Sequence, residues 1–292
     1  MTVYNLGSIN ADMFYEVPHI PVPGETLAAK HMRQGLGGKG ANQSVALIRS
    51  GAEVKHIGAV GPDGDWMLDR LNSLGLDTDL VAKLTVPSGH AIINVADDGE
   101  NAITLFPGAN QAIPSKHIKV ALADIGPDDW LVLQNETNGQ TQAIDLAIAA
   151  GARICYSAAP FDADATKKVL DKIDILAVNE GEANELLTAM HLPILASLDI
   201  PAVLMTRGAQ GAVFYDLENN TEVEADALNV TPVDTTGAGD TFLGFFIGRL
   251  DAGDGVAEAL QIASQAAALK VTRPGTADAI PALSDVLAFS GE

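Results

Sequence analysis

Cysteine is almost absent from this sequence, because Cys155 is the only one. No intrachain disulfide can therefore form, and a zinc site built from cysteines is excluded. Cys155 lies within the apolar run 152–156, so we interpret it as a buried structural thiol rather than a nucleophile.

Basic residues are also scarce, with 17 Lys and Arg against 38 Asp and Glu and a formal net charge of −21. A chain with this charge should bind neither nucleic acid nor an anionic membrane through a general electrostatic field. A polyphosphate ligand would have to be held locally, by backbone amides, a few cations and metal ions.

Long hydrophobic runs are missing as well. No apolar run reaches membrane-spanning length, and the N-terminus, MTVYNLGSIN, lacks the basic and apolar regions of a secretion signal. We therefore expect a cytoplasmic protein.

What the sequence does contain, over 292 residues of which 47% are hydrophobic, is an alternation of strand-length apolar runs with helical patterns. Strands are predicted at residues 3–6, 54–60, 130–133, 153–156, 173–178 and 202–205, and helices at 41–50, 66–74, 141–150, 180–190, 242–250 and 256–270. This alternation favours right-handed crossovers and an α/β fold, with a mostly parallel sheet covered on both faces.

Two stretches break the alternation. Residues 13–32 combine Pro and Gly with short extended pieces, and residues 90–106 are typical of two strands joined by the turn Asp97-Asp98-Gly99. We predict that they form a small β appendage, which is either a lid over a site or a hairpin without function.

The first glycine cluster is Gly35-Leu36-Gly37-Gly38-Lys39-Gly40-Ala41-Asn42. It contains a formal G-x-G-x-x-G, but a dinucleotide fingerprint should follow the first strand, which ends here at Gly7-Ser8-Ile9-Asn10. It is not a Walker A motif either, because Gly40 follows Lys39 where Ser or Thr should stand. A glycine-rich turn into a helix remains, with Asn42 able to offer a donor and an acceptor to a sugar hydroxyl.

The second cluster, Asp234-Thr235-Thr236-Gly237-Ala238-Gly239-Asp240-Thr241-Phe242, precedes an apolar helix. Glycines here free backbone amides at a helix N-terminus to point at one spot, where the helix dipole adds partial positive charge. Such a turn binds an anion without lysines. Asp240 could simply stabilise the dipole, but one carboxylate would suffice for that and the cluster has two.

These clusters and four further motifs resemble the ribokinase-like carbohydrate kinases, the PfkB group, over essentially the whole chain. The further motifs are Gly7-Ser8-Ile9-Asn10-Ala11-Asp12, Pro23-Gly24-Glu25-Thr26, Gly108-Ala109-Asn110 and Asn179-Glu180-Gly181-Glu182. The resemblance implies a three-layer α/β/α fold in a single domain over residues 1–292. Its central sheet would be mostly parallel, and a small β-sheet lid would come from about residues 12–33 and 88–107.

The resemblance also implies a phosphotransferase with an alcohol acceptor, using ATP and Mg²⁺. Asp240 would be the general base, and the amides of Gly237, Ala238 and Gly239 would stabilise the transferring phosphoryl group. The sugar would be held by Asp12, Gly38, Asn42, Glu136 and Asp240. The nucleotide would contact Asn179, Thr206, Gly208, Gly211, Gly237 and Gly239, and Mg²⁺ would be organised through water by Asn179 and Glu182.

Members of this group often use a monovalent cation beside the anion site. The matching positions, which imply K⁺, are Asp234, Thr236, Arg273 and Gly275. The chain departs from the group at Ala279, where Ser is common, and in the short segment 187–200. It departs also at Arg207, which would be either a phosphate contact or a surface residue.

The Gly-Ser-Ile-Asn-x-Asp and Gly-Gly-Lys-Gly-Ala-Asn motifs favour D-ribose as acceptor, giving ribose 5-phosphate. The open alternatives are another sugar or a nucleoside as acceptor, and a catalytically silent sugar- or nucleotide-binding regulator on the same fold. Exposed strand edges and apolar residues at Ile92, Ile93 and Ile103 predict a homodimer formed through the lid.

Overall fold

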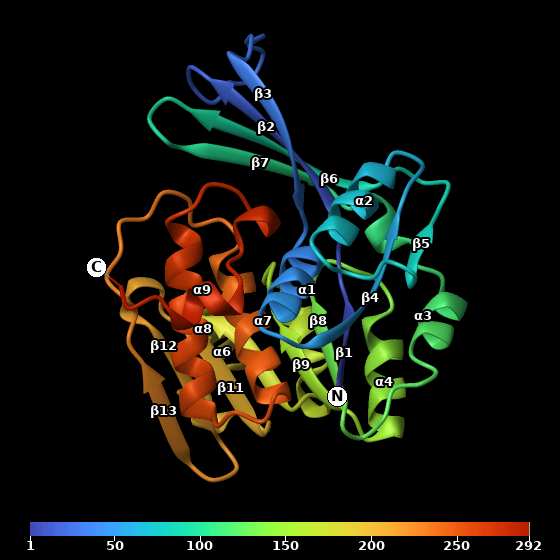
Figure 1. The fold of residues 1–292 in the computed structure, drawn as a ribbon, viewed down its shortest axis with the longest axis vertical. Helices are drawn as coiled ribbons and strands as arrows, with labels where there is room; N and C mark the ends of the chain where they lie inside the picture. The colour runs from blue at the N-terminus through green and yellow to red at the C-terminus, as the bar shows by residue number, and fades with distance from the viewer. Residues whose placement is uncertain (292) are drawn as a thin grey trace.

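The computed structural model describes residues 1–291, in which a large sheet lies between two helical layers and a smaller sheet stands at one end (Figure 1). Within these residues, nine strands form the large sheet in the order β13-β12-β11-β10-β9-β8-β1-β4-β5. All neighbours from β11 to β5 are parallel, and β12 and β13 add an antiparallel edge. The strands are β1 (Thr2–Leu6), β4 (Glu53–Val60), β5 (Val81–Lys83), β8 (Trp130–Gln134), β9 (Arg153–Ser157), β10 (Ile175–Asn179), β11 (Ala202–Thr206), β12 (Ala212–Asp216) and β13 (Thr221–Ala225).

Successive residues of the central strands face opposite helical layers, as the pleat of a strand requires. In β1, Val3 packs in one hydrophobic cluster and Tyr4 in the other, and both are buried. The cluster around Val3 includes α1 (Lys39–Arg49), α2 (Asp65–Ser73), α7 (Ala238–Asp251), α8 (Val256–Val271) and α9 (Leu283–Leu287). The cluster around Tyr4 includes α3 (Ser115–Ala121), α4 (Gln140–Ala150) and α6 (Glu180–Met190), with α5 (Ala163–Lys167) beside α6.

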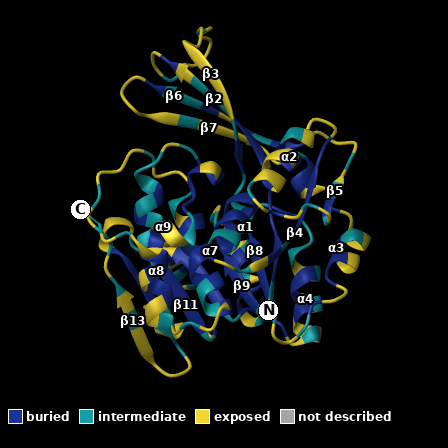
Figure 2. Ribbon diagram, viewed as in Figure 1, coloured by how far each residue is buried: buried dark blue, intermediate teal, exposed yellow. Residues whose placement is uncertain are grey.

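The smaller sheet has the order β3-β2-β6-β7, formed by β2 (Asn10–Val17), β3 (His31–Gly37), β6 (Gly89–Ala96) and β7 (Asn101–Phe106). The two segments predicted to form a β appendage therefore pair with one another, through the parallel contact between β2 and β6. Much of this sheet is exposed (Figure 2), and β3 and β7 are its two outer strands. Ile92 and Ile103 are exposed as predicted, whereas the prediction for Ile93 is wrong, because that side chain is buried against Phe14 and Ala91.

The predicted fold class is confirmed, and most of the predicted elements lie within one or two residues of the observed ones. The edge hairpin of β12 and β13 was not predicted, nor were the short elements β5, α3, α5 and α9. Five short 3₁₀ turns lie in the described chain at Gly108–Gln111, Leu170–Lys172, Leu195–Ser197, Gly208–Gln210 and Ala277–Ala279. Cys155 is buried and free, as predicted. Among residues 1–291, no helix combines the length and apolar character needed to cross a membrane.

Close packing of backbone explains much of the first glycine cluster. Gly40, in the first turn of α1, lies against Gly7, and a Cβ on Gly40 would come within 2.3 Å of the Gly7 Cα. Gly38 has φ +94, and a Cβ there would lie 2.7 Å from the carbonyl oxygen of Ser8. The N-terminus of α1 can therefore sit directly on the end of β1, which brings Asn42 to the carboxyl edge of the sheet.

Candidate active site

The N-terminus of α7 carries backbone amides that the fold leaves unpaired. Gly237 is the N-cap residue, with φ +74, and its carbonyl accepts the first helical bond from the Thr241 amide. The Ala238 amide donates at 3.2 Å to the Thr235 carbonyl, whereas the amides of Gly237 and Gly239 have no acceptor in the described chain. Two of the three predicted amides are thus free to bind an anion at the positive end of the helix dipole.

The carboxylate of Asp240 lies in the first turn of α7 and is held by two side-chain amides of α1. Asn42 Nδ2 donates to Oδ2 at 3.0 Å, and Gln43 Nε2 donates to Oδ1 at 3.0 Å. Asp240 is only 8% exposed, so both bonds are shielded from water. The carboxylate is fixed in orientation next to the free amides, while the remaining lone pairs of its oxygens can still accept a proton.

Gln43 is itself held by a buried chain of amides that begins in the sheet. Gln134, the last residue of β8, donates through Nε2 to the side-chain oxygens of Gln43 and Asn5, each at 2.7 Å. Asn5, in β1, donates in turn to the Gly40 carbonyl at 2.9 Å and to Ser44 at 2.8 Å. The position of Asp240 is therefore set by two central strands as well as by α1.

A cavity of about 190 Å³ brings together most of the predicted phosphate-side residues. Its lining includes Asn179, Glu182, Thr206, the turn 237–239 and Asp240. A Cβ built on Gly239 would meet no atom within 4 Å, so the space beside its Cα is open. Because Gly239 lines the cavity and its amide has no acceptor, an anionic group in the cavity can approach this amide.

A second cavity of about 510 Å³ adjoins the first and shares Thr206, Thr235, Ala238, Gly239 and Phe242 with it. Gly208 and Gly211, which were predicted to contact the nucleotide, line it together with apolar residues of α8 such as Ala267 and Ala268. A largely apolar pocket beside an anion site has the chemistry that a nucleotide needs.

The predicted sugar residues Asp12, Gly38, Asn42 and Glu136 line neither cavity, and among them only Asn42 is hydrogen-bonded to Asp240. Asn42 bonds Asp240 directly, and Glu136 Oε2 accepts from the Lys39 amide at 3.1 Å and from the Ser8 hydroxyl. Asn42 Oδ1 is buried without a hydrogen-bond donor in the described chain. A buried acceptor without a donor is costly, so this atom suits a ligand hydroxyl.

Two carboxyl groups on the sugar side have raised pKa values. Burial and the nearby Glu136 raise the pKa of Asp12 to about 7, and Arg33 opposes the shift. Burial also raises the pKa of Glu136, against the hydrogen bond from Ser8 and the charge of Lys39. The two groups repel each other when ionised, and hydroxyl donors from a sugar would relieve part of that cost.

Comparison with known proteins agrees with this geometry. The family model for pfkB family carbohydrate kinases matches residues 2–283. The chain is 34% identical to the ribokinase of Haemophilus influenzae over 303 aligned positions, which cover 99% of this chain and 98% of that protein. The chain belongs to the pfkB family of carbohydrate kinases.

Solved structures of family members share the whole fold. The ribokinase of Cryptococcus neoformans in complex with ADP superposes with a TM-score of 0.85 at 31% identity, covering 98% of each chain. The ribokinase of Arabidopsis thaliana, complexed with ribose and ATP, has a TM-score of 0.83 at 27% identity and covers 99% of each chain.

Lys39 also belongs to this site, although the sequence motifs predicted no role for it. It is the first residue of α1 and lines the smaller cavity. The negative charge of Asp240 raises its pKa most, burial opposes this, and Glu136 and Glu182 add to the increase. A lysine at the positive end of a helix dipole is unfavourable unless an anion is nearby. The position of Lys39 near the predicted start of a helix could therefore have indicated an anion site.

Asn179 and Glu182 form a capping box at the start of α6. The Asn179 side chain accepts from the Glu182 amide at 2.9 Å, and Glu182 Oε2 accepts from the Asn179 amide at 2.8 Å. Both residues also line the smaller cavity. Over residues 1–291, no three His, Cys, Asp or Glu side chains gather as metal ligands. The chemistry present fits an ion that keeps its water shell, as Mg²⁺ usually does.

The loop from Asp234 to Gly237 is anchored by hydrogen bonds. Asp234 Oδ1 accepts from the Thr236 amide and Oδ2 accepts from the Gly275 amide, each at 2.9 Å. The Arg273 side chain points elsewhere, since its guanidinium lies 3.5 Å from Asp285. Arg207 pairs with Glu224 at 3.5 Å, across the edge strands.

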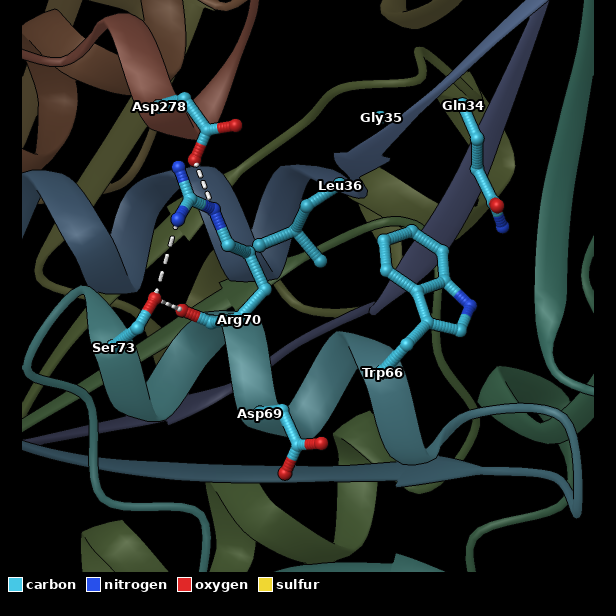
Figure 3. A pocket seen from close by; sticks show the side chains of 8 residues that line it. All are labelled: Gln34, Gly35, Leu36, Trp66, Asp69, Arg70, Ser73 and Asp278. Atoms are coloured by element: carbon cyan, nitrogen blue, oxygen red, sulfur yellow. Dashed lines mark hydrogen bonds and ion pairs between the residues drawn. The ribbon is translucent and has the colours of Figure 1, made fainter.

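A further hollow lies between α2 and the 3₁₀ turn Ala277–Ala279, where Arg70 bonds Asp278 and the Trp66 ring stands beside Leu36 (Figure 3). No residue predicted for the active site lines it. The exposed Arg70–Asp278 ion pair joins α2 to the chain that follows Gly275.

Proposed function

We propose that the protein transfers the γ-phosphate of ATP to the primary hydroxyl of a small sugar, with D-ribose as substrate and ribose 5-phosphate as product. The observation that carries this proposal is the Asp240 carboxylate, held by Asn42 and Gln43 beside the free amides of Gly237 and Gly239. The relatives named ribokinase, one of them complexed with ribose and ATP, support the choice of sugar.

In this proposal the sugar hydroxyl lies between Asp240 and the γ-phosphate. Asp240 accepts the hydroxyl proton as the oxygen attacks phosphorus, and ADP leaves in line. The amides of Gly237 and Gly239 stabilise the charge on the phosphoryl oxygens. Lys39, which faces the same cavity, adds a positive charge to a site that is otherwise acidic.

The sugar is held by groups that the ligand-free protein leaves partly unsatisfied. Asn42 Oδ1 accepts a hydroxyl, and the carboxylates of Asp12 and Glu136 accept others. Asp12 belongs to β2, so the four-stranded sheet carries a sugar contact and acts as a lid. Covering the sugar excludes water, which limits hydrolysis of ATP.

Asn179 and Glu182 would hold Mg²⁺ through its waters, and the ion would neutralise charge on the phosphates of ATP. This chain's own residues orient the hydroxyl, accept its proton and bind the phosphoryl oxygens.

We also propose a homodimer formed through the lid. Register places Phe14, Ile93 and Ile103 on the face that carries Asp12, and Ile103 is 60% exposed on the outer strand β7. An outer strand with exposed apolar residues favours pairing with a second copy of the same surface.

A coupled assay of ATP turnover tests the substrate, with ribose, deoxyribose, fructose, tagatose phosphate and nucleosides as acceptors. Ribose should give the highest kcat/KM. A higher kcat/KM with another acceptor would overturn the choice of ribose. Tight sugar or ATP binding without any acceptor-dependent turnover would instead identify a silent regulator.

A further inference from the structure

Lys270 is a lysine with no exposed surface, located in the last turn of α8. Its ammonium donates to the main-chain carbonyl of Asp234 at 2.9 Å. The carboxylates of Asp234 and Asp240 lie close enough to act on its charge. A buried ammonium persists only where hydrogen bonds and opposite charge compensate it, so its place beside the anion site has to be explained.

The position of this ammonium coincides with the region where the family resemblance implied a monovalent cation. Asp234, the first of the implied ligands, has three oxygens, and each already accepts a hydrogen bond. The donors are the Thr236 amide, the Gly275 amide and the Lys270 ammonium. A cation bound to the Asp234 carbonyl would lie next to the ammonium, where like charges repel strongly.

The other side of the implied cation site is also altered. Ala279 lies beside Gly275, because a Cβ built on Gly275 would be 4.0 Å from the Ala279 Cβ. Alanine has no side-chain oxygen to offer as a ligand. The residues present therefore do not fit a bound K⁺ ion, contrary to what the resemblance implied.

We propose that the ammonium of Lys270 takes the place of the monovalent cation in this protein, so that turnover does not require K⁺. The inference rests on the proposed function, since it concerns the same anion site. Lys270 touches no substrate and is a positioning residue: it holds the Asp234 carbonyl, three residues before the N-cap of α7.

The loop held in this way has several other anchors. The amides of Val233 and Asp234 both donate to the Val271 carbonyl, which ties the loop to the end of α8. After Gly275, the Thr276 hydroxyl donates to the Leu36 carbonyl at the base of β3. Lys270 thus completes a connected set of bonds between the anion site and the lid. An ammonium on the chain is present at every salt concentration, unlike a dissociable ion.

The test compares turnover in K⁺ with turnover in tetramethylammonium at constant ionic strength. The wild type should change by less than about twofold, because its cation is part of the chain. Lys270→Ala should lose about tenfold or more in kcat in tetramethylammonium and regain activity in K⁺ or NH₄⁺. Lys83→Met, which removes an exposed lysine on β5, is the control and should behave as the wild type.

Lys270→Met removes the charge but keeps a long apolar side chain. It is therefore the variant to use if Lys270→Ala does not fold. It should melt as a folded protein and show reduced kcat. A wild type stimulated manyfold by K⁺, or a folded Lys270→Met variant with full kcat in tetramethylammonium, would overturn the inference.

ADP binding by calorimetry separates this inference from the proposed function. Wild-type affinity for ADP should be equal in K⁺ and tetramethylammonium, and Lys270→Ala should bind more tightly in K⁺. If no sugar supports turnover, the proposed function fails, but these affinities still decide the role of Lys270. An ADP affinity of the wild type that depends on K⁺ would contradict it.

Discussion

Asn42 Nδ2 lies 3.0 Å from Oδ2 of Asp240, although 198 residues separate them in the chain. The contact joins the two glycine clusters of the sequence. Gly38 and Gly40 let α1 sit on the end of β1, and Gly237 starts α7, so both helices begin at the same edge of the sheet. The base is thus placed by the same packing that forms the core.

Gln43 holds the second oxygen of Asp240, so its loss should affect the chemical step more than sugar binding. We expect Gln43→Met to lower kcat about tenfold, while the sugar KM stays within about twofold. Steady-state kinetics with varied sugar measures both values. Gln142→Met, which removes an exposed amide on α4, is the matched control and should be neutral. An unchanged kcat in Gln43→Met would mean that the hydrogen bond does not orient the base.

Asp12 should make sugar binding depend on pH. Its pKa of about 7 means that the carboxylate, which accepts sugar hydroxyls, is formed only as pH rises through 7. The sugar KM should therefore increase by up to about tenfold for each pH unit below 7. Asp12→Asn should bind sugar more weakly at pH 8 and show a flat profile. A wild-type KM that does not vary between pH 5.5 and 8 contradicts the assignment.

The same shift makes Asp12 destabilising at neutral pH. The folded protein keeps the proton up to about pH 7, whereas the unfolded chain loses it near pH 3.8. The contribution of Asp12 to the free energy of unfolding is greatest below pH 3.8. It falls by on the order of 4 kcal/mol as pH rises to 7. In denaturant unfolding, the free energy of unfolding of Asp12→Asn should increase relative to that of the wild type as pH rises from about 4 to 7. A constant difference between the two proteins would exclude the raised pKa.

Substitution of Gly239 by alanine should test the anion site without disturbing the fold. A Cβ there meets no protein atom within 4 Å, and Ala in place of Gly in a helix stabilises by about 0.5–1 kcal/mol. Gly239→Ala should therefore melt at or above the wild-type temperature, yet lose about tenfold or more in kcat/KM for ATP because the methyl group fills the anion site. Gly255→Ala, also in open space but remote from the cavities, should keep normal kinetics. Normal ATP kinetics in Gly239→Ala would place the phosphates elsewhere.

The lid surface should control assembly. Light scattering should give the wild type a mass of two chains, each of 30.3 kDa. Ile103→Asp should give one chain, because it places a charge in the apolar contact. Val120→Asp, at an equally exposed apolar residue of α3, should remain a dimer. A monomeric wild type at working concentration would refute assembly through the lid.

The sequence predicted the α/β fold because its strands are fully buried apolar runs with clear helical patterns between them. It missed β13, an exposed edge strand with the sequence Thr-Glu-Val-Glu-Ala. It also missed β12, although Ala212, Val213 and Phe214 form a buried apolar run. The prediction that Ile93 is exposed was wrong because β6 is an inner strand of the smaller sheet, where Ile93 packs against Phe14 and Ala91. Strand order, which the sequence does not show, decides this.

For the site, the glycine motifs located Asp240 and its neighbouring amides, since those depend on local backbone. Contacts between residues far apart in the chain could not be predicted from the sequence. Nothing near Lys270 in the sequence indicates that its ammonium meets the Asp234 carbonyl, or that Gln134 links Asn5 to Gln43. Such contacts exist only once the helices have packed on the sheet.

The role of Asp240 as base is tested most directly by the kcat of Asp240→Asn with ribose and ATP. The substitution keeps the size of the side chain and removes its ability to take the hydroxyl proton. We predict a loss on the order of 10²-fold or more, with sugar binding and the melting temperature largely retained. A folded Asp240→Asn variant that turns over at close to the wild-type rate would contradict the account.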